Sequence, residues 1–157
     1  MTEPRPDAAD LAGIDEARAA ARRARAPAAE RCGALAVTAD GGRHPGTTIR
    51  LAGAAGLSAC AEQIALSAAR AAGASPIARL YLWVPAAAGA HPCGRCLQLW
   101  RELAPQARCL LQRGDAPPTE LDLAALLPEP FTSYPSAAPP ASDPGAGDPP
   151  PRAAGGA

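Results

Sequence analysis

The spacing of hydrophobic and polar residues predicts helices and strands through most of the chain. Apolar residues at helical intervals predict a first helix over residues 11–25, with Asp10 as its N-cap. The aliphatic run at residues 33–39 predicts a buried strand, and Asp40-Gly41-Gly42 predicts a turn. A second strand over residues 47–51 would then complete a hairpin with the first.

Helices and strands alternate in the second half of the predicted order. Ser58 is expected to cap a helix over residues 60–72, which Gly73 ends. The later elements are a strand at 77–84, a helix at 93–103, a strand at 107–112, and a short strand and short helix within 119–127. Such an order favours crossover units and predicts an α/β protein, with a mixed sheet covered by helices on both faces.

The 157 residues suit one domain, which we place at residues 10–134 after a flexible N-terminal segment, residues 1–9. From residue 135 to 157 the sequence is rich in Pro, Ala and Gly and has no apolar periodicity. Such a segment buries too little apolar surface to offset the entropy lost on ordering, so we expect a disordered tail.

Composition and charge narrow the classes of function. The 15 basic and 15 acidic residues give zero net charge, which predicts no electrostatic footprint for nucleic acid. No apolar run is long enough to cross a bilayer and no signal peptide opens the sequence, so we expect a cytoplasmic protein without membrane association. Five cysteines, an odd count, argue against a secreted disulfide scaffold.

Three cysteines stand at the predicted starts of helices. Cys60 begins Cys60-Ala61-Glu62, whereas Cys93 and Cys96 belong to the motif PCGRC at residues 92–96. Residues three apart share one face of a helix, so Cys93 and Cys96 can bind one ion with Cys60 as a third ligand. Three protein ligands leave one position open, which is typical of a catalytic zinc site. The alternatives are buried thiols or a redox pair, and Cys32 and Cys109 are expected in the core.

Three thiolates and one Zn²⁺ sum to a charge of minus one, which would weaken the activation of a bound water. Two helix N-termini would offset this charge, and Arg95, between two of the ligands, could add a hydrogen bond or a positive charge. Glu62 could take a proton from a zinc-bound water and pass it to a substrate nitrogen. Its alternative role is to stabilise the N-terminus of its own helix.

The combination of Cys60-Ala61-Glu62 and the PCGRC motif resembles the signature of the zinc-dependent cytidine deaminase family. Residues 33–37, 56–62, and 126–128 with Phe131 are also similar to segments of its small nucleoside-type members. The resemblance implies a three-layer α/β/α fold around a mixed five-stranded sheet, and a homo-oligomer, either a tetramer or a dimer. It further implies Zn²⁺ held by Cys60, Cys93 and Cys96, with Glu62 carrying protons during hydrolytic deamination of a small nucleoside-type substrate.

The sequence departs from this family where a sugar would bind. Ile49 and Leu51 replace the Asn-x-Glu that usually holds the sugar hydroxyls, and hydrophobic side chains cannot make those hydrogen bonds. Glu30 stands near the usual aromatic residue, and Gln63 replaces the Arg often found after the catalytic Glu.

These departures leave several functions open. The substrate is expected to be cytidine, deoxycytidine or a related cytosine nucleoside, or a non-standard cytosine compound, because the second cysteine motif also resembles blasticidin S deaminases. A catalytically degenerate protein with structural zinc is the alternative. Neutral charge and few aromatic residues argue against a base within nucleic acid.

Overall fold

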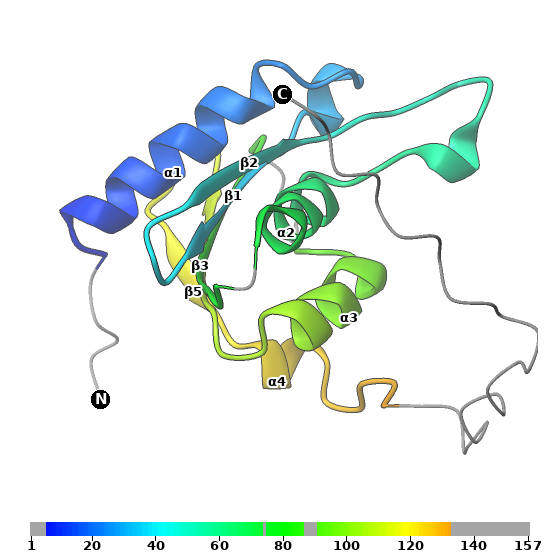
Figure 1. The fold of residues 1–157 in the computed structure, drawn as a ribbon. Coiled ribbons are helices and arrows are strands. Elements are labelled where there is room, and N and C mark those ends of the chain that lie inside the picture. The colour runs from blue at the N-terminus through cyan, green and yellow to red at the C-terminus, as the bar shows by residue number, and fades with distance from the viewer. Residues whose placement is uncertain (1–5, 74, 87–90, 133–157) are drawn as a thin grey trace, which may run out of the picture.

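A five-stranded sheet, ordered β2-β1-β3-β4-β5, forms the centre of the protein in a computed structural model that describes residues 6–73, 75–86 and 91–132 (Figure 1). The strands are β1 (Gly33–Thr38), β2 (Arg43–Thr47), β3 (Ile77–Val84), β4 (Arg108–Arg113) and β5 (Thr119–Leu121). The helices are α1 (Ala8–Ala21), α2 (Ala61–Ala72), α3 (Gly94–Leu103) and α4 (Leu123–Leu126), with 3-10 turns at Ala28–Glu30 and Ala55–Leu57.

The sheet is mixed. Strand β1 pairs antiparallel with both β2 and β3, whereas β3 and β4 run parallel and are joined by a connection that contains α3. Strand β5 returns antiparallel to β4. The predicted hairpin and crossover are therefore both present.

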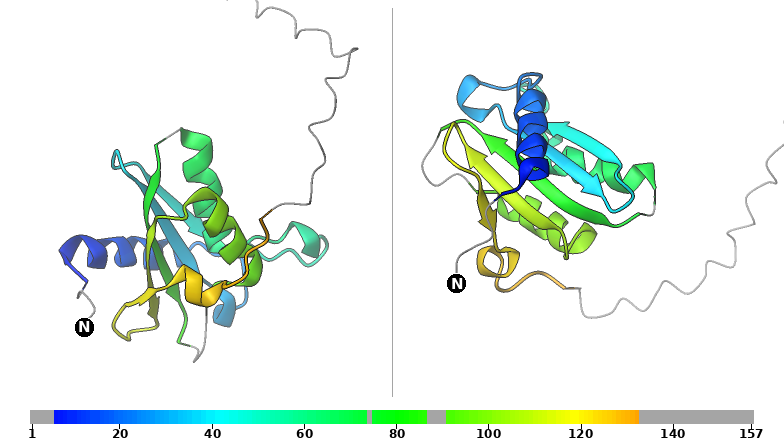
Figure 2. Two further views of the ribbon diagram at one scale, coloured as in Figure 1. Left: turned by 90° about the horizontal axis from the view of Figure 1, so that it is seen from below. Right: turned by 90° about the vertical axis from the view of Figure 1, so that its left-hand side faces the viewer.

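Helices cover both faces of the sheet. Helix α1 crosses one face and contacts β1 and β3, while α2 and α3 lie side by side on the other. The left view of Figure 2 shows the sheet between these two layers. This arrangement confirms the predicted three-layer α/β/α fold.

Each face of the sheet has its own buried core. Ile14 of α1 packs with Leu35, Tyr81 and Leu110 of the sheet. The opposite core is larger and contains Leu66, Leu80, Trp100, Cys109 and many alanines. Glycines let both helical layers approach the sheet, because a Cβ on Gly33 would meet the backbone of α1 and one on Gly46 would meet the backbone of α2.

Two predicted elements are placed wrongly. The second strand is Arg43–Thr47, not 47–51, because residues 49 and 59 instead form an isolated bridge outside the sheet. The first helix is Ala8–Ala21 with Asp7 as its N-cap, not 11–25 with Asp10, because Asp7 and Asp10 form a reciprocal capping box.

The start of α2 also differs from the prediction. Cys60, not Ser58, occupies its N-cap position, and the Ser58 hydroxyl accepts a hydrogen bond from the Leu51 backbone N–H at 3.0 Å. The strand at 77–84 agrees with the prediction at both ends. The predicted tail, 135–157, lies outside the described residues.

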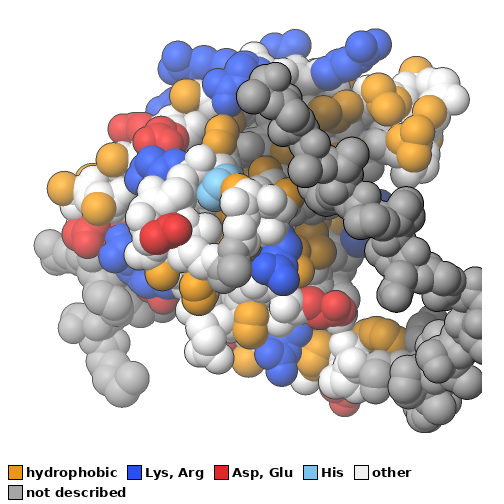
Figure 3. Space-filling model, in the orientation of Figure 1, with side chains coloured by type: hydrophobic (Ala, Val, Ile, Leu, Met, Phe, Trp, Pro, Cys, Tyr) orange, Lys and Arg blue, Asp and Glu red, His pale blue; other side chains and the backbone are white. Residues whose placement is uncertain are grey.

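Arginine side chains gather near the C-terminal end of α1 on the face seen in Figure 3. The exposed basic residues of this stretch are Arg22, Arg23, Arg25 and Arg31. Within the described part of the chain, every helix is too short or too polar to cross a membrane.

Candidate metal and catalytic site

The starts of α2 and α3 lie next to each other and each begins with a cysteine. Cys60 and Cys93 occupy the two N-cap positions in extended backbone conformations, and neither side chain makes a capping hydrogen bond. Their sulfur atoms are therefore not used to cap the helices, and the first N–H groups of both helices, which have no partner within the helix, lie close to them. Cys96 follows in the first turn of α3.

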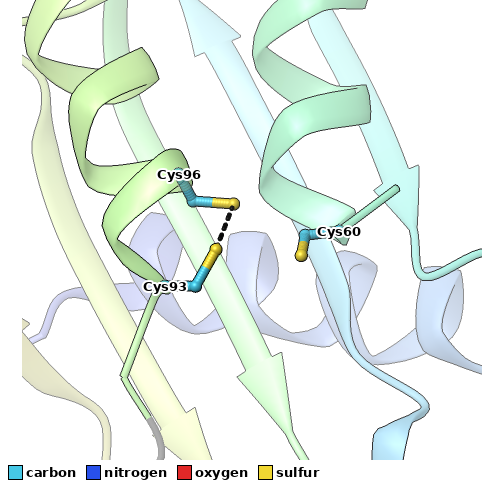
Figure 4. Close-up of side chains that lie close together, drawn as sticks. All are labelled: Cys60, Cys93 and Cys96. Atoms are coloured by element: carbon cyan, nitrogen blue, oxygen red, sulfur yellow. Dashed lines mark hydrogen bonds between the residues drawn. The ribbon is translucent and has the colours of Figure 1, made fainter. Parts of the chain in front are cut away.

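The three sulfur atoms form one cluster, between the first turns of α2 and α3 (Figure 4). All lie within 4.8 Å of one another, and the Cys93 and Cys96 Sγ atoms are 3.6 Å apart. Two sulfurs bound tetrahedrally to one zinc, each at about 2.3 Å, would be about 3.8 Å apart. The donor set and its spacing therefore fit a zinc ion with one remaining position for a further ligand.

The helix N-termini act on these thiols. Burial opposes ionisation of Cys93, but hydrogen bonds from the backbone of Cys96, from the neighbouring thiols and from the Arg95 backbone give it a lowered pKa. Burial raises the pKa of Cys96, as do the charges of Glu62 and Cys60. The pKa of one thiol of the pair is thus lowered, whereas that of the other is raised.

Glu62 lies in the first turn of α2, beside the cluster. Although it is two residues from Cys60, its charge acts on both Cys96 and Cys32, so its carboxyl group is near these sulfurs. Burial raises the pKa of Glu62, and a hydrogen bond from its own backbone N–H and the charge of Arg50 only partly oppose this effect. A carboxyl group with a raised pKa next to a potential metal site is a candidate for proton transfer.

Arg95 contacts the cysteine cluster through its backbone N–H. Its exposed guanidinium Nη2 donates to the Ser58 carbonyl oxygen at 3.4 Å, while its N–H is one of the donors that stabilise the Cys93 thiolate. Compensation of thiolate charge by the Arg95 side chain stays a prediction.

Arg50 is a residue of this site that no sequence motif indicates. Its Nε donates to Glu30 Oε2 at 2.7 Å, and its Nη1 donates to the Ala59 carbonyl oxygen at 3.2 Å. Hydrogen bonds to Glu30 and to the Cys60 sulfur raise the pKa of Arg50 against the effect of burial. Only the position of Arg50 between Ile49 and Leu51 could have drawn attention to it, since the contact depends on how separate segments meet.

Cys32 was expected in the core, but it is half-buried at the edge of the site. Burial, followed by the charge of Glu62, raises the pKa of its thiol. The expectation is confirmed for Cys109, which is 1% exposed within the larger core.

Gln63 does not contribute a charge to the cluster. It lines a hollow of about 340 Å³ between α2 and α3, together with Cys96 and Arg95. Its buried Oε1 has no hydrogen-bond partner among the described residues.

The chain was compared with protein-family models, curated proteins and solved structures. Models of protein families give no match, and curated proteins give none either. Solved structures do match. The cytidine deaminase from Burkholderia pseudomallei is 33% identical with a TM-score of 0.69, over 77% of this chain and 98% of that one.

Two mycobacterial structures are similar as well. The cytidine deaminase from Mycobacterium tuberculosis is 27% identical over 81% of this chain and 100% of that one, with a TM-score of 0.61. The one from Mycobacterium leprae is 26% identical over 78% and 100%, with a TM-score of 0.59.

Proposed function

Because this chain belongs to the cytidine deaminase family, we propose that it is a zinc-dependent hydrolase that deaminates a cytosine-type base in a nucleoside or nucleoside-like small molecule. The observation that carries the proposal is the gathering of Cys60, Cys93 and Cys96 at two helix starts, with Glu62 beside them. These are the donor set of a metal site and the proton carrier that hydrolysis requires.

Cys60, Cys93 and Cys96 would hold the zinc ion. When bound, zinc supplies Lewis acidity and an activated water as the nucleophile. The chain's contribution is to fix three sulfurs on two helix starts, where partial positive charges offset part of their negative charge.

Glu62 carries the protons. Its carboxylate accepts a proton from the attacking water and donates it to the ring nitrogen next to the reacting carbon. It then transfers a second proton from the added oxygen to the departing amine. The carbon–nitrogen bond breaks, ammonia leaves, and the ring retains a carbonyl, so that one water is consumed for each ammonia released. Burial of Glu62 suits it to exchange protons in both directions.

The proposed substrate class is a cytosine nucleoside or a non-standard cytosine compound. Ile49 and Leu51 offer no side-chain hydrogen bonds to sugar hydroxyls, and Glu30 is paired with Arg50. We also propose a homo-oligomer, because small members of the family commonly complete their sites with neighbouring subunits.

The test is ammonia release from cytidine, deoxycytidine, cytosine and blasticidin S by protein of measured zinc content. We expect release from at least one compound and a loss of about 10²- to 10⁴-fold in kcat for Glu62→Gln, with zinc retained. Glu102→Gln, an exposed glutamate on α3, is the matched control and should keep its activity. Zinc-loaded protein that releases no ammonia from any compound would contradict the proposal.

A catalytically degenerate protein with structural zinc is the second candidate, favoured by the apolar Ile49 and Leu51. It predicts that zinc removal lowers the melting temperature while no compound is deaminated. Glu62→Gln would then change neither zinc content nor any measured function.

A further inference from the structure

The proposed zinc centre would keep an uncompensated charge. Three thiolates and one Zn²⁺ carry a net charge of minus one, and the partial charges of two helix N-termini offset only part of it. A full positive charge fixed next to a sulfur would do more, because charges interact strongly in a partly desolvated site.

Arg50 supplies such a charge. It follows β2 in the segment where Ile49 and Ala59 exchange two backbone hydrogen bonds, of 3.0 and 2.9 Å. This bridge holds residue 50 beside the residue that precedes Cys60. The Arg50 backbone N–H is also fixed, since it donates to the Arg25 carbonyl oxygen at 2.8 Å.

The Arg50 side chain is held next to Cys60. Its guanidinium donates to the Glu30 carboxylate and to the carbonyl oxygen of Ala59, the residue before Cys60, and the Cys60 sulfur is near enough to raise the pKa of Arg50. The two hydrogen bonds orient the guanidinium group, whose donors have a rigid geometry.

The ion pair itself contributes little to stability. The Arg50 and Glu30 side chains are 36% and 48% exposed, and exposed pairs are typically worth below about 1 kcal/mol. Stability therefore does not account for the arrangement. What the Arg50–Glu30 pair does is keep the positive charge of Arg50 next to Cys60, with Glu30 bound to the guanidinium.

We propose that Arg50, anchored by Glu30, is the positioning residue that compensates the charge of the Cys60 thiolate in the zinc complex. This inference rests on the proposed zinc function, but it assigns the role to a residue that precedes the first cysteine motif. Arg95, whose guanidinium donates to the Ser58 carbonyl oxygen, is the matched alternative.

The first measurement is the zinc dissociation constant, by competition with a chromogenic chelator. Substitution of partners of metal ligands typically weakens metal binding by about 10- to 100-fold, and we expect this for Arg50→Gln. Arg50→Lys should recover part of the affinity. Glu30→Gln, which keeps the cation but loses its anchor, should weaken binding by at most about fivefold. Arg95→Gln should weaken binding less than Arg50→Gln does, and Arg101→Gln, at an exposed arginine of α3, should bind zinc as the wild type does.

The second measurement separates an electronic effect from a general loss of structure. In cobalt-loaded protein, loss of the cation makes the Cys60 sulfur a better electron donor. The sulfur-to-cobalt absorption bands of Arg50→Gln should therefore move to longer wavelength, whereas those of the control Arg101→Gln stay in place. If Arg50→Gln does not fold, Arg50→Lys, which keeps a charge but loses the planar guanidinium, should shift the bands in the same direction by a smaller amount.

Three outcomes overturn the inference. They are wild-type zinc affinity in Arg50→Gln, equal weakening by Arg50→Gln and Arg95→Gln, and unmoved cobalt bands in Arg50→Gln. These results differ from failure of the proposed function, in which the wild-type protein itself binds no zinc.

Discussion

Each face of the sheet holds a carboxyl group, Asp10 fully buried and Glu62 half-buried, and the two groups differ in how their charge is compensated. On the α1 face, Asp10 is 1% exposed and accepts hydrogen bonds from Arg108 at 2.6 Å, Tyr81 at 3.0 Å and Arg79 at 3.1 Å. On the α2 face, the effect of burial on Glu62 is only partly offset by a hydrogen bond from its own backbone N–H and by the charge of Arg50. A carboxylate with all its partners in place stabilises the fold, whereas one left under-compensated keeps the capacity to move protons.

The pKa directions follow this difference. Burial alone would raise the pKa of Asp10, but the hydrogen bonds from Arg108, the Asp7 backbone and Tyr81 outweigh it and leave the value lowered. For Glu62 the effect of burial dominates and the pKa is raised. The α1 face therefore holds a permanent charge, and the α2 face holds an exchangeable one.

Substitution of the cysteines should give the largest effect and tests whether the α2 face serves zinc binding rather than stability. We expect Cys93→Ala to weaken zinc binding by more than about a hundredfold, since even partners of ligands are worth 10- to 100-fold. Cys93 is exposed, so its truncation should leave the free energy of unfolding of the zinc-free protein nearly unchanged. Cys109→Ala is the matched control, because it removes a buried thiol from the core and should retain zinc. Tight zinc binding by Cys93→Ala would show that the cluster is not the metal site.

Much of the larger core and of this site could be predicted because the signals are local. The continuous apolar run at residues 77–84 gives β3 its bounds, and the two cysteine motifs lie next to recognisable helix starts. The spacing of Cys93 and Cys96 predicts a shared face from helix geometry alone. The sulfurs of these motifs are in fact brought together.

The parts that could not be predicted depend on long-range contacts. Strand β2 reads RHPGT, with a Pro and a Gly that disfavour strands. It forms because the edge position tolerates Pro45 and because Gly46 admits α2. Arg50 lies next to Cys60 because residue 49 pairs with both Arg25 and Ala59. No spacing along the chain signals that contact.

Gly33 and Gly46 give a second comparison of the two faces. A Cβ on Gly33 would lie 2.6 Å from the Ala21 nitrogen of α1, and a Cβ on Gly46 would lie 2.6 Å from the Ala65 nitrogen of α2. Because these contacts are with rigid helix backbone, we expect each Gly→Ala change to lower the free energy of unfolding by about 2 kcal/mol. Denaturant unfolding measures this effect.

Zinc binding should separate the two glycine variants. Gly46→Ala pushes α2 away from the sheet, and Ala61, which its Cβ would also meet, directly follows Cys60. Its zinc affinity should fall, whereas Gly33→Ala moves only α1 and should bind zinc normally. Equal zinc affinities in the two variants would contradict the idea that the packing of α2 on the sheet positions Cys60.

Asp10→Asn is the smallest of these changes and isolates the α1 face. The two arginines reach solvent, with side chains 39% and 28% exposed, so both can hydrate when the carboxylate is lost. We expect the free energy of unfolding to fall by about 1.5 kcal/mol at pH 7, with zinc affinity unchanged. Asp115→Asn, at an ion pair with an 85% exposed carboxylate, is the control and should change stability little.

The effect of Asp10→Asn should also depend on pH, in a direction that follows from linkage. Because folding lowers the pKa of Asp10 below its ordinary value of 3.8, its stabilisation is present above that value and is lost as the pH falls through the folded-state pKa. The difference in unfolding free energy between wild type and Asp10→Asn should therefore be constant from pH 5 to 7, in the approximate range where Asp10 is ionised in both states, and should shrink below about pH 4. A difference that persists at low pH would mean that Asp10 stabilises α1 through its shape and not through its charge, and the contrast with Glu62 would then lose its electrostatic basis.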